Sequence, residues 1–196
     1  MRKLSRPLFY PTAPAFILAL SVLPLLGLSA GEARAQPQPA KIGKQVPDFE
    51  IEALRDSGRA FTPSDFEGRY VLLNLWATWC GPCIRKIPKL KKARQRYSPK
   101  KLAILNVSFD GSRSKATRFL GDREMPGSHA YAGRSGLGGK FGAKFARVPN
   151  MSPSSRGLPN LTLVGPKGTV VDIIAAGDTT GLLEMLKKQL SSRQSG

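Results

Sequence analysis

The chain is poor in the side chains that bind metals or staple small folds together. Its 196 residues include two cysteines and one histidine, His129. A structural zinc site needs about four such ligands, so this set is incomplete. Two cysteines separated by only two residues also cannot form the framework of a disulfide-rich scaffold. We therefore expect no resident metal, and a length sufficient for one domain with its own core plus extra segments.

Acidic side chains are also scarce. The sequence has 31 Lys and Arg against 13 Asp and Glu, a formal net charge of +18. No acidic residue occurs between Glu67 and Asp110, whereas basic residues are dense from Arg85 to Lys101. This pattern fits either a solvated basic face or a patch that steers acidic proteins. The sequence lacks the aromatic spacing of an RNA-recognition motif and the pattern of a helix-turn-helix, so we expect no nucleic-acid partner.

Only one apolar run is long enough to concern a membrane. It extends from Ala15 to Leu28, follows a basic start and precedes Ala33-Arg34-Ala35. This order is typical of a signal peptide, here residues 1–35, and predicts an exported protein in the periplasm or another extracytoplasmic compartment. The alternative is an uncleaved N-terminal segment that tethers the protein. Residues 36–45, rich in Pro, Gln and Lys, read as a linker.

Both cysteines lie in one motif, Cys80-Gly81-Pro82-Cys83, directly behind the apolar run from Tyr70 to Trp76. A strand that ends in C-x-x-C and then opens a helix places the first sulfur at a helix N-terminus. There the backbone N–H groups and the helix dipole stabilise a thiolate. The second sulfur follows one turn later and can close a small disulfide ring. Such a pair exchanges two electrons with other thiols and needs no cofactor.

The residues from Asn74 to Cys83 resemble the active site of the thioredoxin superfamily, and are most similar to its exported TlpA/ResA-like thiol-disulfide oxidoreductases. The resemblance continues in Phe61–Gly68, in the helix-kinking Pro88 and in Gly157–Gly168, which matches the loop, strand and turn bearing the family's cis-proline. It implies an α/β, thioredoxin-like fold in which helices flank a central mixed β-sheet, with an N-terminal extension and a central insertion.

We expect this domain over residues 46–192, with a variable insertion at 122–156 made of loops around one short helix near Lys140 to Ala146. The periodicity further predicts buried strands at 70–76 and 102–109, a helix at 82–97, a short helix at 114–120, a hairpin across Gly165–Gly168 and a C-terminal helix.

The resemblance also implies roles for individual residues. Cys80 is the attacking thiol and the more exposed of the two, and Cys83 resolves the mixed disulfide. Substrate-binding positions are implied at Trp79, Gly81, Pro82, Leu158 and Pro159, the last being the family's cis-proline. Ordinary core packing is the alternative for Trp79, and a plain trans turn proline is the alternative for Pro159.

Two positions depart from common patterns of the superfamily. Asn74 stands where cytosolic thioredoxins have a buried aspartate, which removes the usual base for Cys83. Lys86 stands three residues after Cys83, where many TlpA/ResA-like proteins carry a glutamate. A nearby ammonium lowers a thiol pKa, whereas a carboxylate raises it. We therefore expect a more acidic Cys80 and a more oxidising couple than in the relatives that carry the glutamate, unless Lys86 points into water.

These observations predict an extracytoplasmic thiol-disulfide oxidoreductase. Its expected partners are exported proteins with thiols or disulfides, including apocytochromes c before haem attachment, and a membrane redox partner that recycles the cysteine pair. Cytochrome c maturation and general disulfide homeostasis both fit. A peroxiredoxin-like thiol peroxidase is one alternative. A copper chaperone that combines the two thiolates with His129 is another.

Overall fold

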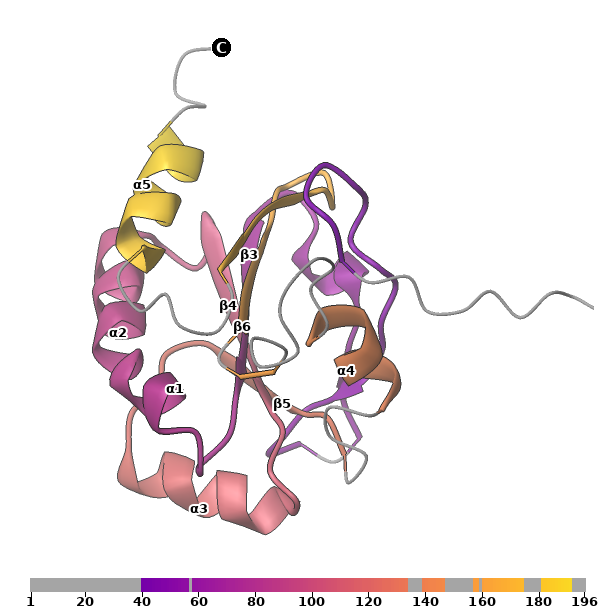
Figure 1. Cartoon of the computed structure of the whole chain (residues 1–196), viewed down its shortest axis with the longest axis vertical. Helices are drawn as coiled ribbons and strands as arrows, with labels where there is room; N and C mark the ends of the chain where they lie inside the picture. Colours follow the sequence, from indigo (N-terminus) through magenta and orange to yellow (C-terminus); the bar gives the residue numbers. More distant parts are fainter. Residues whose placement is uncertain are drawn as a thin grey trace, which may run out of the picture. The chain divides into compact units, whose positions relative to one another are not determined.

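The fold is built on a five-stranded mixed sheet (Figure 1). The computed structural model describes residues 40–56, 58–133, 139–146, 157–158, 160–174 and 181–191. The strands follow the order β5-β4-β3-β6-β7. Their bounds are β3 Tyr70–Trp76, β4 Leu102–Ser108, β5 Ser128–Tyr131, β6 Asn160–Val164 and β7 Val170–Ile174. Strands β3, β4 and β5 run parallel, whereas β6 and β7 join antiparallel, which confirms the expected mixed α/β sheet.

Strand β3 lies at the centre of the sheet, and all seven of its residues are buried, all of them apolar except Asn74. Tyr70, Leu72 and Trp76 point to one face, and Val71, Leu73 and Leu75 to the other. Continuous apolar strands of this kind are typical of sheets that are covered on both sides. The end of β3, where the two cysteines follow, is therefore held between packed layers on both faces of the sheet.

The two faces of the sheet have different coverings. The face that contacts the two cysteines, here called the cysteine face, packs against α1 Gly81–Arg85, α2 Ile87–Arg96, α3 Arg113–Asp122 and α5 Leu182–Ser191. The reverse face packs against the N-terminal segment and α4 Lys140–Phe145 (Figure 1). On the reverse face Phe49 meets Phe141 and Phe145 edge-on, with centroids 5.6 and 5.7 Å away, a favoured aromatic geometry.

The N-terminal segment forms a short hairpin of β1 Ile51–Glu52 and β2 Ala60–Phe61, followed by the 3-10 turn η1 Pro63–Phe66. The packed domain begins earlier than residue 46. The N–H of Ala40 donates to the Lys144 carbonyl at 2.8 Å, and that of Gly43 to the Val170 carbonyl at 2.8 Å. Residues 40–45, expected in the linker, are thus hydrogen-bonded to the domain, which the Pro-, Gln- and Lys-rich composition of residues 36–45 conceals.

The expected insertion at 122–156 contains a strand of the sheet. Strand β5 pairs in parallel with β4, from Leu105↔Ser128 to Ser108↔Tyr131. It escaped the sequence analysis because it has four residues and only Ala130 is buried. Gly127 introduces it with φ of 106°, and a Cβ there would lie 2.4 Å from the Ile104 carbonyl oxygen, so only glycine lets the chain pass.

The remaining expected elements are present. Helix α4 occupies the position of the short helix expected near Lys140, and β6 and β7 form the hairpin across Gly165–Gly168. Residues 134–138 and 147–156 of the expected insertion lie outside the described residues, as does the expected signal peptide at 1–35. In the described part of the chain no helix is both long and apolar enough to cross a membrane.

Candidate active site

The cysteine pair lies at the junction between β3 and α1. Cys80 is the N-cap of α1, and Cys83 lies in its first turn. The expected single helix is divided at Lys86, which ends α1 and precedes α2. Pro88 accounts for this division, because it has no N–H to donate to the Ile84 carbonyl. The expected kink is confirmed as a break between two helices.

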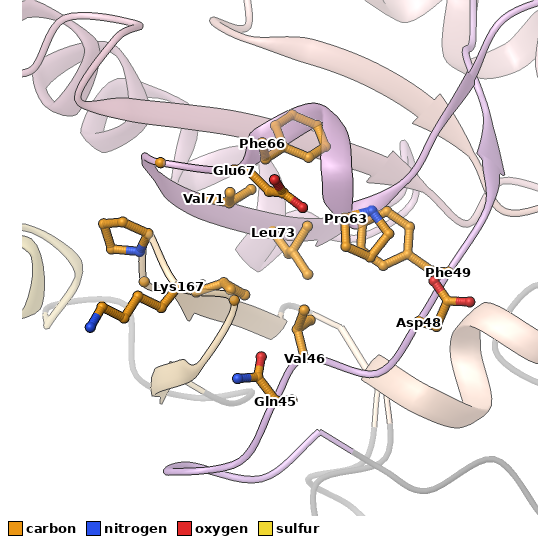
Figure 2. Close-up of a pocket in the computed structure, with 15 residues that line it drawn as sticks. Gln45, Val46, Asp48, Phe49, Pro63, Phe66, Glu67, Val71, Leu73 and Lys167 are labelled. Carbon is orange, nitrogen blue, oxygen red and sulfur yellow. The ribbon is translucent and has the colours of Figure 1, made fainter.

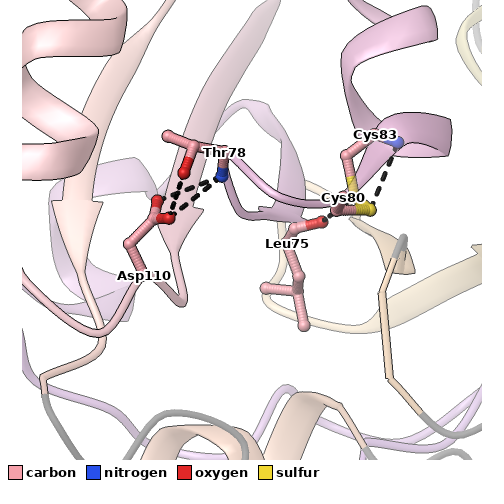
Figure 3. Close-up of a disulfide and its surroundings, with 5 residues drawn as sticks. All are labelled: Leu75, Thr78, Cys80, Cys83 and Asp110. Atoms are coloured by element: carbon pink, nitrogen blue, oxygen red, sulfur yellow. Dashed lines mark hydrogen bonds between the residues drawn. A yellow bond between two sulfur atoms is a disulfide. The ribbon is translucent and has the colours of Figure 1, made fainter.

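The two sulfurs form a disulfide, with an S–S distance of 1.99 Å (Figure 3). The Cys80 Sγ accepts the N–H of Cys83 at 3.3 Å, the bond that stabilises a thiolate at this position. The Cys83 Sγ lies 3.9 Å from the Leu75 carbonyl oxygen. Exposure does not distinguish the two residues, which are 5% and 4% exposed. The N-cap position of Cys80 supports the predicted attacking role, whereas the greater exposure that the resemblance implied is absent.

Trp79 is the exposed apolar group beside the disulfide. It is 64% exposed, so the interpretation as ordinary core packing is wrong. Gly81 is exposed and Pro82 is half-buried. The Arg85 guanidinium turns back toward this loop: its Nη1 is 3.5 Å from where a Cβ on Gly81 would be. An exposed indole, next to Cys80 in sequence, and a cation thus lie at this loop.

The loop before β6 approaches the same end of β3. Asn160 pairs with Leu75, the residue whose carbonyl lies close to Cys83. Leu158, two residues earlier, is half-buried and packs against the apolar clusters on both faces of the sheet. Pro159 lies outside the described residues, so its isomeric state and its substrate-binding role stay predictions.

Asn74 and Lys86 are both buried. The Asn74 Nδ2 donates to the Asn106 Oδ1 at 2.8 Å across the β3–β4 pair. Asn106 in turn donates to the carbonyls of Pro126 and Ser128, where β5 begins. Lys86 is 1% exposed, so the alternative that it points into water is wrong. Its N–H donates to the Cys83 carbonyl at 3.1 Å, which fixes its backbone against the resolving cysteine.

A buried carboxylate that sequence reasoning missed anchors the loop before Cys80 (Figure 3). Asp110 is 0% exposed and accepts the Thr78 N–H at 3.1 and 3.2 Å, and the Thr78 hydroxyl at 2.6 Å. It also accepts the Ser108 hydroxyl at 2.9 Å. One signal could have revealed it: Asp110 is the first acidic residue after Glu67 and follows directly on a buried strand.

His129 does not join the cysteines in a metal site. Its Nε2 lies 3.1 Å from the Met125 carbonyl oxygen, to which the neutral ring donates. Burial lowers the pKa of His129 to about 4, and the charge of Arg55 acts in the same direction, against the hydrogen bond to Met125. Over the described residues, no group of three or more His, Cys, Asp or Glu side chains could hold a metal.

The reverse face carries a cavity of about 470 Å³ (Figure 2). Its floor is apolar and includes Phe49, Val71 and Leu73, and its rim includes Glu67 and Lys167. Neither cysteine and none of the residues around them lines it. The cavity is therefore separate from the redox site.

A mixed sheet of this order, with a disulfide at the start of the helix that follows its central strand, defines a thioredoxin-like protein. The chain belongs to the Redoxin family, whose sequence profile matches residues 41–190. Solved structures that share its fold include two from Bacteroides. The thioredoxin domain of a thiol-disulfide oxidoreductase from Bacteroides vulgatus is 22% identical with a TM-score of 0.60, over 76% of this chain and 96% of that one. A thiol:disulfide interchange protein from Bacteroides sp. is 21% identical with a TM-score of 0.60, over 80% and 95%.

Sequence relatives carry related names. The chain is 33% identical over 121 residues to the thiol:disulfide interchange protein DsbE of Vibrio cholerae, which is 61% of this chain and 63% of the relative. It is 32% identical over 87 residues to the thiol-disulfide oxidoreductase ResA of Oceanobacillus iheyensis, 43% of this chain and 45% of the relative. These matches span less than two thirds of either relative. ResA of Bacillus thuringiensis subsp. konkukian is 26% identical over 151 residues, 77% of this chain and 79% of the relative.

Proposed function

We propose that this protein is an extracytoplasmic thiol-disulfide oxidoreductase whose reactive centre is the Cys80–Cys83 pair. The observation that carries the proposal is the disulfide at the N-cap of α1, with the Cys83 N–H directed at the Cys80 sulfur. The family and the names of the relatives support the reaction class. The export pattern at residues 1–35 supports the location.

The reaction proceeds in two exchange steps that balance. In the reducing direction the Cys80 thiolate attacks one sulfur of a substrate disulfide, the substrate S–S bond breaks, and the released substrate sulfur leaves as a thiolate. The Cys83 thiolate then attacks the Cys80 sulfur of the mixed disulfide. This closes the Cys80–Cys83 bond and releases the second substrate sulfur. The oxidising direction is the reverse, and a membrane redox partner restores the starting state.

The surface around the disulfide favours acidic protein substrates. Trp79 offers an exposed apolar face and Arg85 holds its guanidinium over the same loop. Such a pair fits a polypeptide with an acidic residue beside its cysteine, for example an exported protein before haem attachment or disulfide repair. Exchange with acidic substrates should slow as salt rises, because screening weakens steering. In Arg85→Gln this salt dependence should be weaker.

Lys86 modulates the couple in this proposal. Lys86 is buried and its backbone N–H bonds to the Cys83 carbonyl. In this proposal its ammonium lies near the pair and favours the thiolate form of the reduced protein, and a stabilised reduced form makes the couple more oxidising. Replacing Lys86 by Met keeps the size and removes the charge. Lys86→Met should therefore be more reducing than the natural protein, by up to about 30 mV for a tenfold change in the equilibrium constant. An unchanged potential would show that the charge of Lys86 does not tune the cysteine pair.

The first test is the equilibrium reduction potential of the pair in defined thiol buffers, together with turnover of a protein disulfide. A potential near about −270 mV marks a reductase suited to cytochrome c maturation or disulfide repair, and one near about −120 mV marks an oxidant. Cys80→Ser should abolish turnover, whereas Cys83→Ser should stop at the mixed disulfide. Failure to exchange with any protein disulfide, combined with turnover of peroxide, would assign the chain to the thiol peroxidases instead.

A further inference from the structure

The carboxylate of Asp110 is buried and bonds to the loop that precedes Cys80. Its donors are the Thr78 amide and the hydroxyls of Thr78 and Ser108, all of them neutral. The Asp110 N–H also donates to the Ser108 Oγ at 3.2 Å, so backbone and side chain are both fixed. Within the described residues no ion pair involves Asp110. The field of a carboxylate held by neutral donors alone is not cancelled by a partner cation.

The bonds act on the loop that presents Cys80. Thr78 donates both its amide and its hydroxyl to the carboxylate, and Cys80 closes the loop by donating its N–H to the Ala77 carbonyl at 3.1 Å. Trp79, between them, is exposed. An exposed loop of this kind holds one position only where buried bonds fix it, because each immobilised residue loses conformational entropy. The contacts to Asp110 supply that anchor.

The charge is close enough to act on the thiol. Thr78 and Cys80 are two residues apart, which the backbone spans in at most about 7 Å. The carboxylate touches Thr78, so it lies on the order of 10 Å from the Cys80 sulfur. Two unit charges at about 10 Å and an effective dielectric of about 20 shift a pKa by about one unit. Of the cationic side chains near this turn, Arg85 reaches the loop, and Lys86 is buried three residues after Cys83.

We propose that Asp110 is the positioning residue of the redox site: its buried carboxylate clamps the loop at Thr78 and its negative charge opposes ionisation of the Cys80 thiol. The inference rests on the proposed function in taking Cys80 as the attacking group. It gives the site two buried ionisable side chains of opposite charge type, Lys86 and Asp110, from distant parts of the chain. Asp110 thereby limits how oxidising the couple becomes.

The test measures the pKa of Cys80 in a Cys83→Ser background, from the pH dependence of its alkylation rate, with and without Asp110→Asn. The amide keeps the shape and removes the charge. The pKa of Cys80 should fall by about one unit, a tenfold rise in the thiolate fraction below that pKa. Asp122→Asn, an exposed acid at the end of α3, is the matched control and should leave it unchanged. An equal pKa in folded Asp110→Asn and the parent protein would overturn the proposal.

A second variant keeps the proposal testable if Asp110→Asn does not fold. Thr78→Val removes the hydroxyl donor and leaves the carboxylate and its charge in place. We expect disulfide exchange to slow several-fold while the pKa of Cys80 moves by less than a few tenths, because positioning is lost and the field is kept. An unchanged exchange rate in Thr78→Val would show that this hydrogen bond does not position the loop. Alkylation needs no protein substrate, so failure of the proposed function would leave the pKa comparison readable.

Discussion

The two faces of the central sheet use the same strands for different purposes. On β3 and β4 the reverse face carries only apolar residues: Val71, Leu73, Leu75, Ala103, Leu105 and Val107. The cysteine face of these strands also carries Asn74, Asn106 and Ser108, all buried. Buried polar groups are tolerated where each finds a hydrogen-bond partner, and these three do. Both faces bury apolar residues, but the cysteine face also holds buried polar groups and the two sulfurs, and substitutions on either side can test that difference.

The largest effect on stability should come from the reverse face. Leu73 is 1% exposed on the central strand, so Leu73→Ala removes buried apolar atoms and leaves a cavity. The free energy of unfolding should fall by about 2–5 kcal/mol. Urea denaturation measures it. The reduction potential should match that of the natural protein while the fold persists, and a shifted potential would show that the two faces are coupled.

Asn74→Asp, one residue further along the same strand, tests the cysteine face. A carboxylate there meets the Asn106 Oδ1, and Asn106 cannot turn its amide without losing its bonds to Pro126 and Ser128. We expect a loss of about 1–3 kcal/mol. The folded-state pKa of the new acid is raised, so the loss is small at low pH and grows as pH rises through that pKa. Denaturation at two pH values checks this, and a pH-independent loss would contradict it.

His129 should make the free energy of unfolding depend on pH. Its pKa is about 4 in the folded protein and 6.5 in the unfolded chain, chiefly because of burial. The unfolded chain therefore binds the proton first as pH falls, and stability is lost between pH 6.5 and about pH 4. The half-buried ring sets the loss at about 1–2 kcal/mol. His129→Gln keeps a donor for Met125 and should lack this component. Identical pH profiles for both proteins would disprove it.

The smallest change in stability is expected at Trp79. The side chain is 64% exposed, so Trp79→Ala should alter the free energy of unfolding by less than about 0.5 kcal/mol. Exchange with protein disulfides should nevertheless slow several-fold, mainly through a higher KM, because the indole offers an apolar contact for the substrate chain. Exchange with a small-molecule disulfide, which cannot use that contact, is the internal control. Equal slowing for both substrates would argue against docking.

Local sequence patterns were enough to predict the redox motif and most of the helices and strands around it. The apolar run before C-x-x-C predicted β3, the proline predicted the break in the helix, and Gly165–Gly168 predicted the hairpin turn. Each of these features depends on residues close together in the chain. Short-range chemistry decides them, so they can be recognised one segment at a time.

Contacts between distant residues decided the remainder. Strand β5 exists because β4 offers it an edge, and residues 40–45 join the domain because α4 and β7 offer them partners. Lys86 is buried although a lysine in a basic helix is usually solvated. Asp110 meets Thr78 across 32 residues of sequence. A side chain's burial and its partners are properties of the packed chain. The sequence by itself therefore determined which atoms react, and the tertiary structure decided which charges surround them.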